Sequence, residues 1–186
     1  MEAVKKAWAE AKKRNKVLRT MFQDEARFGR INHPKACWAP KPMRPEVPSQ
    51  IVREYVYVFG ALSPKDGRHD SLVLPYADTE AMMIFLKEIS SRYPEEYILM
   101  FIDQASYHKS KGLKIPPNVE LAYLPPRSPE LNPQEQVWDE LKEKFFGNKL
   151  FKSLETVIDR IVEGLRYLES SPLTLTNLTQ RSWMKI

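Results

Sequence analysis

Residues 97–108 read YILMFIDQASYH, and Ile98 to Ile102 within them are five consecutive apolar residues. A strand without polar alternation is typical of a sheet covered on both faces, as in parallel strands between helices. Asp103 follows the last apolar residue directly, and sites in open α/β sheets form at strand ends. The stretch predicts a buried strand of an α/β sheet with Asp103 at a candidate site. The alternative is an aspartate that only starts a turn.

The neighbouring segments supply the other elements of this sheet. REYVYVFGAL (53–62) and HDSLVLPY (69–76) flank the turn sequence SPKDGR, which predicts a hairpin. VLRTMFQD (17–24) and VELAYLP (119–125) predict two more strands. Apolar residues at helical spacing predict helices over about 2–14, 79–92, 133–146 and 154–169, with Asp78 or Thr79 and Ser153 as caps of the second and the last. We therefore expect a mixed α/β layer with five strands.

Composition restricts the class of protein. The chain of 186 residues is long enough for one domain with a substantial core. It has no apolar run near the ~20 residues that span a bilayer, and its charged first residues do not form a secretory signal. The single cysteine, Cys37, excludes an intramolecular disulfide. We expect a cytoplasmic protein without a membrane partner.

Positive charge gathers at two places along the chain. The net charge is +5, and residues 1–20 hold seven Lys/Arg against two Glu. Residues 27–53 hold six Lys/Arg against one Glu, so two basic segments bracket Asp24. This distribution fits a surface for a phosphate backbone. It fits solvated surface equally well. The first segment also has Val4, Ala7, Trp8 and Ala11 at helical spacing, which predicts that these four form the apolar face of a short helix.

Residues 34–48 contain five prolines and are predicted to form an extended loop. Long irregular loops inside compact domains are often functional. Trp38 in this loop has three interpretations: it packs locally, stacks on a base, or reaches a partner subunit.

Three carboxylates stand out by position. Asp24 is predicted to end a strand, as Asp103 does. The third lies in RSPELNPQEQVWDELK (127–142), where Asn132 is a good helix N-cap and Pro133 a good first residue. Helical phase then places Glu135 about 60° outside the apolar stripe of this helix and Asp139 about 40° further out. Glu135 is the preferred candidate, Asp139 is the fallback, and a capping box with Asn132 is the non-catalytic alternative for Glu135.

Carboxylates gathered from separate elements repel one another unless a cation neutralises them. Oxygen ligands suit Mg²⁺ or Mn²⁺, and no Cys/His cluster or Gly-rich phosphate loop offers another chemistry. Such a site can hold two ions about 3.5–4 Å apart and catalyse phosphoryl displacement.

Four blocks of the sequence resemble one family in the expected order. They are FQDEARFGR (22–30), YVFGALSP (57–64), FIDQASYHKS (101–110) and LPPRSPELNPQEQVWDELK (124–142). Together they are similar to the DDE-type transposases of bacterial insertion sequences related to the mariner superfamily. The resemblance implies an RNase H-like fold, a central mixed five-stranded sheet flanked by helices. It also implies that Asp24, Asp103 and Glu135 bind two divalent metals, Mg²⁺ or Mn²⁺, and catalyse hydrolytic nicking at transposon ends followed by attack of the freed 3′-hydroxyl on target DNA.

The resemblance also yields expectations about partners and organisation. DNA is the expected partner and a homodimer the expected active complex, associated with the nucleoid. Only 23 residues precede Asp24, so the helix-turn-helix region usual in such enzymes is expected on a separate subunit, or to be missing from a truncated or decayed copy. Domain boundaries are expected at 1–16 for a basic arm, 17–170 for the catalytic domain and 171–186 for a tail. The candidate DNA contacts, each of which also fits a solvated position, are Arg27, Arg30, Lys41, Arg44, His108, Lys109 and Arg127.

Two other functions remain open at this stage. One is a catalytically inactive DNA-binding protein derived from a transposase. The other is an RNase H-like hydrolase of RNA in hybrids.

Overall fold

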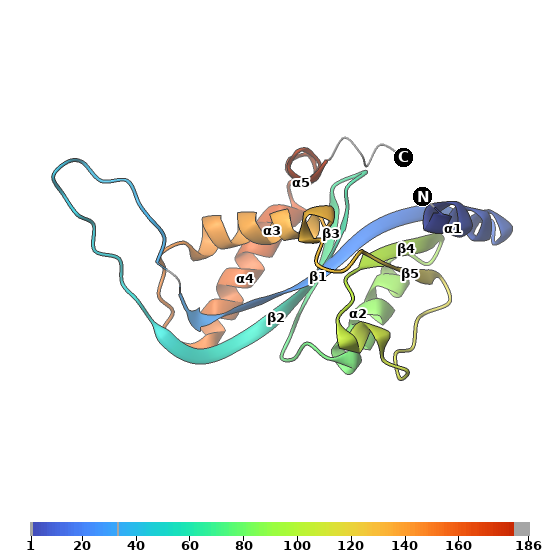
Figure 1. Ribbon diagram of the computed structural model, residues 1–186, viewed down its shortest axis with the longest axis horizontal. Coiled ribbons are helices and arrows are strands. Elements are labelled where there is room, and N and C mark those ends of the chain that lie inside the picture. Colours follow the sequence, from blue (N-terminus) through green and yellow to red (C-terminus); the bar gives the residue numbers. More distant parts are fainter. Residues whose placement is uncertain (1, 33, 181–186) are drawn as a thin grey trace.

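The computed structural model describes residues 2–32 and 34–180, which contain one mixed sheet. Its order is β3-β2-β1-β4-β5, antiparallel from β3 to β1 and parallel from β1 to β5 (Figure 1). The predicted hairpin is confirmed as β2 and β3, and the predicted buried strand is confirmed as β4, which is parallel to both of its neighbours. The strands are β1 (Val17–Ile31), β2 (Ile51–Ser63), β3 (Arg68–Leu74), β4 (Glu96–Ile102) and β5 (Val119–Tyr123).

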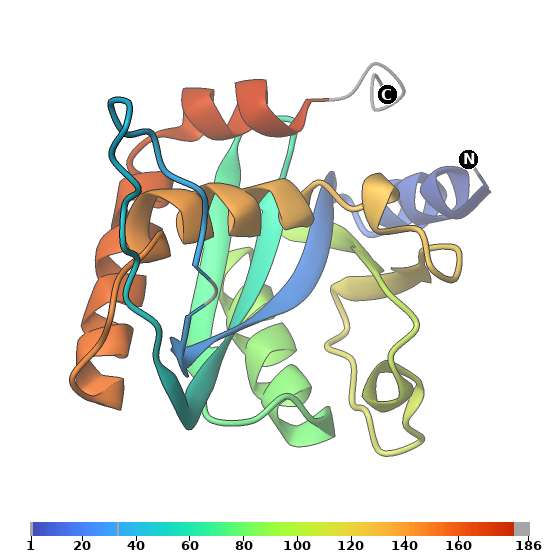
Figure 2. The same cartoon turned by 60° about the vertical axis from the view of Figure 1, so that its left-hand side comes forward.

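Helices cover both faces of the sheet (Figure 2). On one face, α2 (Thr79–Arg92) packs its apolar side against the alternate residues Ile98, Met100 and Ile102 of β4. On the other face, α3 (Gln134–Leu141) and α4 (Leu154–Glu169) cover the half of the sheet formed by β1 and β2. Because β4 is buried on both sides, its lack of polar alternation is explained.

The predicted caps of two helices are confirmed. Asp78 accepts a hydrogen bond from the Ala81 amide at 2.8 Å and begins α2. Ser153 and Thr156 form a reciprocal capping box at the start of α4. None of the helices in the described part of the chain is long and apolar enough to cross a bilayer.

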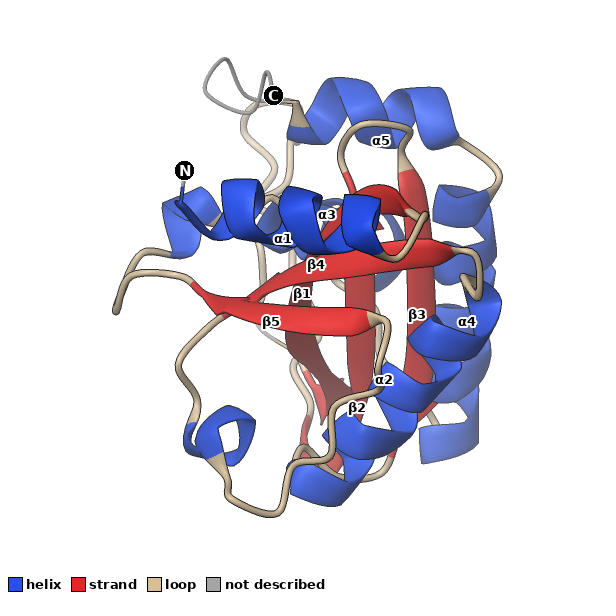
Figure 3. Cartoon of the chain, turned by 90° about the vertical axis from the view of Figure 1, so that its right-hand side faces the viewer, coloured by secondary structure: helices blue, strands red, loops and turns tan. Residues whose placement is uncertain are grey.

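Helix α1 (Glu2–Lys13) lies across β4 and β5 on the same face as α3 (Figure 3). Ala7 and Ala11 of this helix are buried in a cluster with Leu99 and Ala122, and Val4 packs against the same cluster. The prediction that Trp8 belongs to this apolar face is wrong, because Trp8 is 58% exposed. Small residues allow the helix to approach the sheet closely, and the indole is left outside.

The helix predicted over 133–146 is not a single α-helix. It is α-helical only over α3 and continues as a π-helical turn, η3 (Lys142–Phe146). The wider turn places Phe146 against Phe28 of β1, with ring centroids 4.9 Å apart, and Phe145 against Tyr167 of α4 at 5.7 Å. Packing across the sheet and α4 thus decides the helix type here, and local sequence pattern does not reveal it.

The predicted proline-rich loop between β1 and β2 is extended and projects away from the sheet (Figure 1). Its base is tied to the segment after η3, because Asn148 exchanges two hydrogen bonds with the Lys35 backbone and Gln50 bonds to Phe151. Trp38 is fully exposed, so its interpretation as a local packing anchor is wrong.

Within the predicted tail at 171–186, Pro172–Thr179 form helix α5. Leu175 and Thr179 are fully buried, and Gly67, with φ of 68°, lies so close to α5 that a Cβ there would sit 2.0 Å from the Pro172 carbonyl oxygen. Residues 181–186 of that predicted segment lie outside the described residues. The domain boundaries stay predictions.

A buried polar pair lies beneath α3. Gln134 and His69 of β3 are 0% and 5% exposed, and their side-chain nitrogens Nε2 are 2.9 Å apart. The amide nitrogen is the donor, so His69 Nε2 accepts and the imidazole is neutral. Gly60 of β2 makes room for this pair, because a Cβ there would lie 2.6 Å from Gln134 Nε2.

We expect this pair to make the protein acid-sensitive. Burial lowers the pKa of His69 from 6.5 to about 4, against a smaller opposing effect of Asp70. The folded pKa is below the unfolded one, so stability falls as pH decreases from 6.5 towards 4, by about 2 kcal/mol at pH 5. Urea unfolding of wild type and His69→Gln at pH 8 and pH 5 measures this. The loss of unfolding free energy caused by His69→Gln should be smaller at pH 5 than at pH 8 by about 2 kcal/mol. An equal loss at both pH values would contradict a buried, neutral His69.

Candidate active site

Asp24 does not end a strand, contrary to the sequence prediction. It lies in the middle of β1, opposite Gly60 of β2. Strand β1 continues because Ala26 and Phe28 alternate with Glu25 and Arg27, a half-buried pattern that pairs with the apolar residues of β2. The neighbouring strand β4 ends at Ile102, whereas β1 continues to Ile31. Asp24 therefore lies in a part of β1 that no longer pairs with β4.

Asp103 follows the end of β4 and lies level with Asp24. The last residue pair between the two strands is Phe22 opposite Phe101, whose rings stack 5.0 Å apart. Asp24 and Asp103 each come two residues later along their segments, Asp24 within β1 and Asp103 just beyond the last residue of β4. The Asp103 side chain is 55% exposed.

Glu135 lies in the first turn of α3, and this helix is bonded to Asp24. Trp138, one turn after Glu135, is 1% exposed and donates its Nε1–H to Asp24 Oδ2 at 2.9 Å. Burial raises the pKa of Asp24 to about 8, with further contributions from the nearby charges of Glu135 and Glu25. Glu135 is therefore close enough to Asp24 for the two carboxylates to repel each other.

Glu135 does not form the alternative capping box with Asn132. The Asn132 amide donates to the Pro129 carbonyl at 2.9 Å, so it does not need the Glu135 carboxylate. Asn132 Oδ1 itself accepts from the Gln134 amide at 3.1 Å, and the helix starts at Gln134. Glu135 and the exposed Asp139 both line a surface pocket, together with Glu130.

The donor set fits a hard divalent cation. All three side chains offer carboxylate oxygens, the ligands of Mg²⁺ and Mn²⁺. Burial is the main cause of the raised pKa of Asp24, the charges of Glu135 and Glu25 add to it, and a bound cation would favour the ionised carboxylate. Within residues 2–32 and 34–180, no group of three or more His, Cys, Asp or Glu side chains is placed to hold one ion. The fit thus rests on the chemistry of the donors, with each ion needing further oxygens from water or substrate.

Comparison with known families decides the affiliation. Residues 19–158 match the family described as DDE superfamily endonuclease, and this range contains Asp24, Asp103 and Glu135. The chain belongs to this family.

Relatives of this DDE superfamily chain agree in sequence and in fold. "Uncharacterized protein y4pE/y4sA" of Sinorhizobium fredii (strain NBRC 101917 / NGR234) is 37% identical over 130 residues, which are 69% of this chain and 96% of that protein. The Mos1 transposase paired-end complex with the left transposon end superposes with a TM-score of 0.58 at 12% identity, over 96% of this chain and 61% of that one. A pre-cleavage Mos1 transpososome superposes with a TM-score of 0.59 at 11% identity, over 97% of this chain and 61% of that one.

These likenesses confirm the predicted fold. The chain has the RNase H-like fold with a mixed five-stranded sheet flanked by helices, and it spans about three fifths of the length of the Mos1 transposase chains.

In this DDE superfamily chain, His108 is not available to DNA, contrary to the sequence prediction. Its side chain is 1% exposed in the 3-10 helix η1 (Ser106–Lys109). Nδ1 lies 2.8 Å from Asp103 Oδ1, and Nε2 lies 3.2 Å from Glu25 Oε1. Burial alone would lower the pKa of His108, but the bonds to Glu25 and Asp103 outweigh it and raise the pKa.

Glu25 was not recognised as a site residue from the sequence. Its side chain is 7% exposed, and it also accepts from Gln23 Nε2 at 2.7 Å. Burial, followed by the charge of Glu25, raises the pKa of Tyr107, whose ring packs on His108 with centroids 4.4 Å apart. The available signal was the alternation of β1, which directs Glu25 to the sheet face opposite that of Asp24.

The other candidate DNA contacts fall into two groups. Arg30 is bonded to Glu54 and to the Phe151 carbonyl, so it holds β1, β2 and the segment after η3 together. Lys109 is exposed but donates to Gln104 Oε1 at 2.6 Å. The exposed remainder consists of Arg27, which stacks on Tyr55, and Lys41, Arg44 and Arg127.

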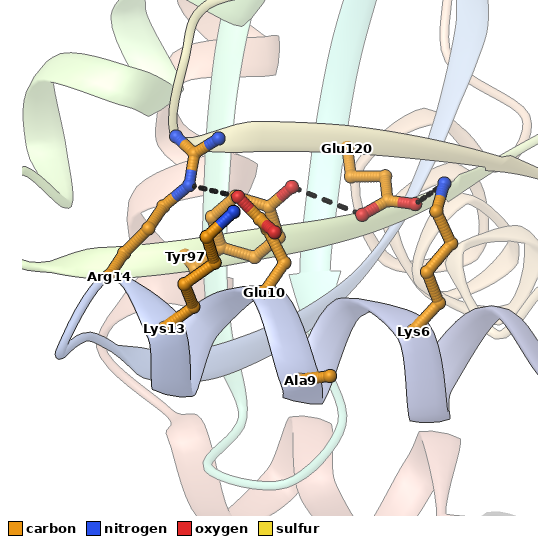
Figure 4. Close-up of a pocket in the computed structure, with 7 residues that line it drawn as sticks. All are labelled: Lys6, Ala9, Glu10, Lys13, Arg14, Tyr97 and Glu120. Atoms are coloured by element: carbon orange, nitrogen blue, oxygen red, sulfur yellow. Dashed lines mark hydrogen bonds and ion pairs between the residues drawn. The ribbon is translucent and has the colours of Figure 1, made fainter.

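Three of the seven Lys/Arg in the basic N-terminal segment, Lys6, Arg14 and Arg19, form ion pairs with acidic side chains. Figure 4 shows a pocket between α1 and strands β4 and β5 in which Lys6 bonds to Glu120 and Arg14 bonds to Glu10. Tyr97 donates to the other oxygen of Glu120. These pairs neutralise part of the charge, and the pocket shares no residue with the carboxylate site.

Proposed function

We propose that this chain is the catalytic domain of a transposase that nicks DNA at transposon ends and joins the freed 3′-hydroxyl to target DNA. The observation that carries the proposal is the placement of Asp24 in β1 and of Asp103 just after the end of the neighbouring strand β4, with the Glu135 helix bonded to Asp24 through Trp138. Family membership supports the reaction class. Mos1 paired-end complexes with Mn and with Mg support the choice of metal.

The three carboxylates are the proposed metal ligands. Asp24, whose surroundings include the charge of Glu135, would hold the two Mg²⁺ or Mn²⁺ ions together with Asp103 and Glu135, and phosphate and water would supply further oxygens. When bound, the ions supply an activated water and stabilise the leaving oxygen. Water attacks phosphorus, the bond to the 3′-oxygen breaks, and a 3′-hydroxyl is released.

The chain's own groups hold this arrangement. Trp138 fixes one oxygen of Asp24, and His108 fixes one oxygen of Asp103, so both carboxylates keep one oxygen for a cation. Exposed Arg27, Lys41, Arg44 and Arg127 are the proposed phosphate contacts, and these bind the backbone without reading bases. A homodimer, a separate helix-turn-helix subunit and location at the nucleoid stay predictions from the resemblance.

Nicking of supercoiled plasmid tests the proposal. We expect relaxed circles with Mn²⁺ or Mg²⁺ and none after the metal is removed with EDTA, because hydrolysis requires the ions. Joining is read with an oligonucleotide that carries a free 3′-hydroxyl.

The alternatives give different results in the same experiment. Salt-sensitive DNA binding that is unchanged by EDTA, without cleavage under any condition, would replace the proposal by the inactive DNA-binding protein. Cleavage restricted to RNA in an RNA–DNA hybrid would replace it by the RNase H-like hydrolase.

A further inference from the structure

We propose that Glu25 and His108 are positioning residues that hold the carboxylate of Asp103 in the orientation needed to bind its metal ion. The inference rests on the proposed function, because it assigns Asp103 as a ligand. The observation behind it is a continuous chain of contacts, Gln23 to Glu25 to His108 to Asp103, with distances of 2.7, 3.2 and 2.8 Å.

Asp103 needs such support because of its place in the fold. It lies just beyond the end of β4, outside the ladder of hydrogen bonds that fixes the strand, and more than half of its side chain is exposed. An aspartate in this setting can exchange between rotamers unless hydrogen bonds hold its carboxylate. Two donors do so: His108 Nδ1 at 2.8 Å and the Ala105 amide at 2.9 Å. Both contact Oδ1, which fixes the plane of the carboxylate.

Glu25 supports the imidazole from the other side. Glu25 follows Asp24 but points to the opposite face of β1, and β1 runs past the end of β4. The turn of chain through η1 fills the space beyond β4 and brings His108 over β1, where Nε2 meets Glu25. The backbone of η1 is held as well, since Tyr123 of β5 donates its hydroxyl to the His108 carbonyl at 2.9 Å.

Gln23 also links this chain of contacts to α3, the helix that carries Glu135. The Gln23 carbonyl accepts from Asn132 Nδ2 at 3.0 Å, and Asn132 Oδ1 accepts the Gln134 amide at the start of α3. Gln23, Glu25, His108 and Asn132 are all shielded from solvent, with Gln23 fully buried and Asn132 only 6% exposed. These four residues therefore link the three segments that carry Asp24, Asp103 and Glu135.

Burial excludes a direct role of His108 in holding DNA. Both ring nitrogens face carboxylate oxygens, and 1% of the side chain is exposed, so no nitrogen is left for a phosphate or an attacking water. A residue that orients a ligand in this way commonly changes metal affinity by 10- to 100-fold when replaced.

Binding of Mn²⁺ by calorimetry, without DNA, tests the inference. Glu25→Ala and His108→Gln should raise the dissociation constant by about tenfold or more, with Glu25→Gln in between because its amide oxygen still accepts from the imidazole. Nicking should then need a higher Mn²⁺ concentration for half its maximal rate, and saturating Mn²⁺ should restore most of that rate. A purely structural role would not move the Mn²⁺ constant.

Asp70→Asn is the matched control. Asp70 is a mostly buried carboxylate of β3 that accepts from Tyr93 and Arg92, far along the sheet from Asp103. The Asp70→Asn variant should have a lower melting temperature and an unchanged dissociation constant for Mn²⁺. Melting of each variant without metal shows that it folds, and if Glu25→Ala does not, Glu25→Gln takes its place.

The outcomes separate the inference from the proposed function. Wild-type Mn²⁺ constants in the folded Glu25 and His108 variants, with loss of binding in Asp103→Asn, would overturn the positioning role and leave the proposed function standing. Wild-type protein that binds no Mn²⁺ and nicks no DNA would overturn both.

Discussion

We expect Glu135→Gln to lower the rate of metal-dependent DNA nicking by about a thousandfold, since a metal stabilises the transition state by several kcal/mol and each 1.36 kcal/mol is tenfold. Glutamine keeps the size of the side chain and removes its charge, so the effect isolates the carboxylate. The assay is the initial rate of plasmid relaxation at saturating Mn²⁺.

The matched control for this variant is Asp139→Asn. Asp139 lies one turn further along α3, lines the same surface pocket and is exposed, so its replacement should leave the rate within about twofold. The reverse pattern, with loss of nicking in Asp139→Asn only, would assign the third ligand to Asp139. The two variants together decide the question that helical phase raised and could not settle.

Stability without metal provides a second, independent expectation for Glu135→Gln. The charge of Glu135 is one cause of the raised pKa of Asp24, so removing that charge relieves repulsion in the folded state. The melting temperature without metal should not fall. A large fall would indicate a structural role for Glu135 and would weaken its assignment as a ligand.

The sequence predicted those parts of the fold that local pattern specifies. Residues 98–102 are apolar without interruption, and they form the strand that is covered on both faces. Asp78 and Ser153 cap their helices because a short polar side chain before an apolar helix satisfies free amides. The order of the motifs also sufficed to predict the family and its RNase H-like sheet, since the same four blocks fall within or beside the strands and α3.

The sequence did not predict features that depend on partners far along the chain. His108 looked like an exposed strand-end residue, yet its ring is buried by contact with Glu25, 83 positions away. Glu25 and Arg27 looked like loop residues after Asp24, because the alternation with Ala26 and Phe28 gains its meaning only from pairing with β2. Helical spacing placed Trp8 on the apolar face of α1, but the face that packs on the sheet consists of smaller residues such as Ala7 and Ala11.

Trp138 carries the second large effect, on folding and on activity together. Its indole is almost fully buried, packs edge-on against Phe28 and His69 at 6.3 and 5.9 Å, and donates to Asp24. Trp138→Ala should lower the free energy of unfolding by about 3–5 kcal/mol, the usual cost of emptying a large aromatic site. Trp138→Phe keeps much of the packing but loses the donor, so about 1–2 kcal/mol is expected. Urea denaturation without metal measures both.

Activity separates the two functions of this tryptophan. Trp138→Phe leaves Asp24 Oδ2 without its indole donor, so nicking should slow at least tenfold although the protein is folded, because a misplaced ligand costs 10- to 100-fold. The matched control is Trp38→Ala, which removes a fully exposed indole and should leave stability within about 0.5 kcal/mol. Wild-type nicking by Trp138→Phe would mean that packing alone places α3, and that the bond to Asp24 is not needed to align the first carboxylate with the other two.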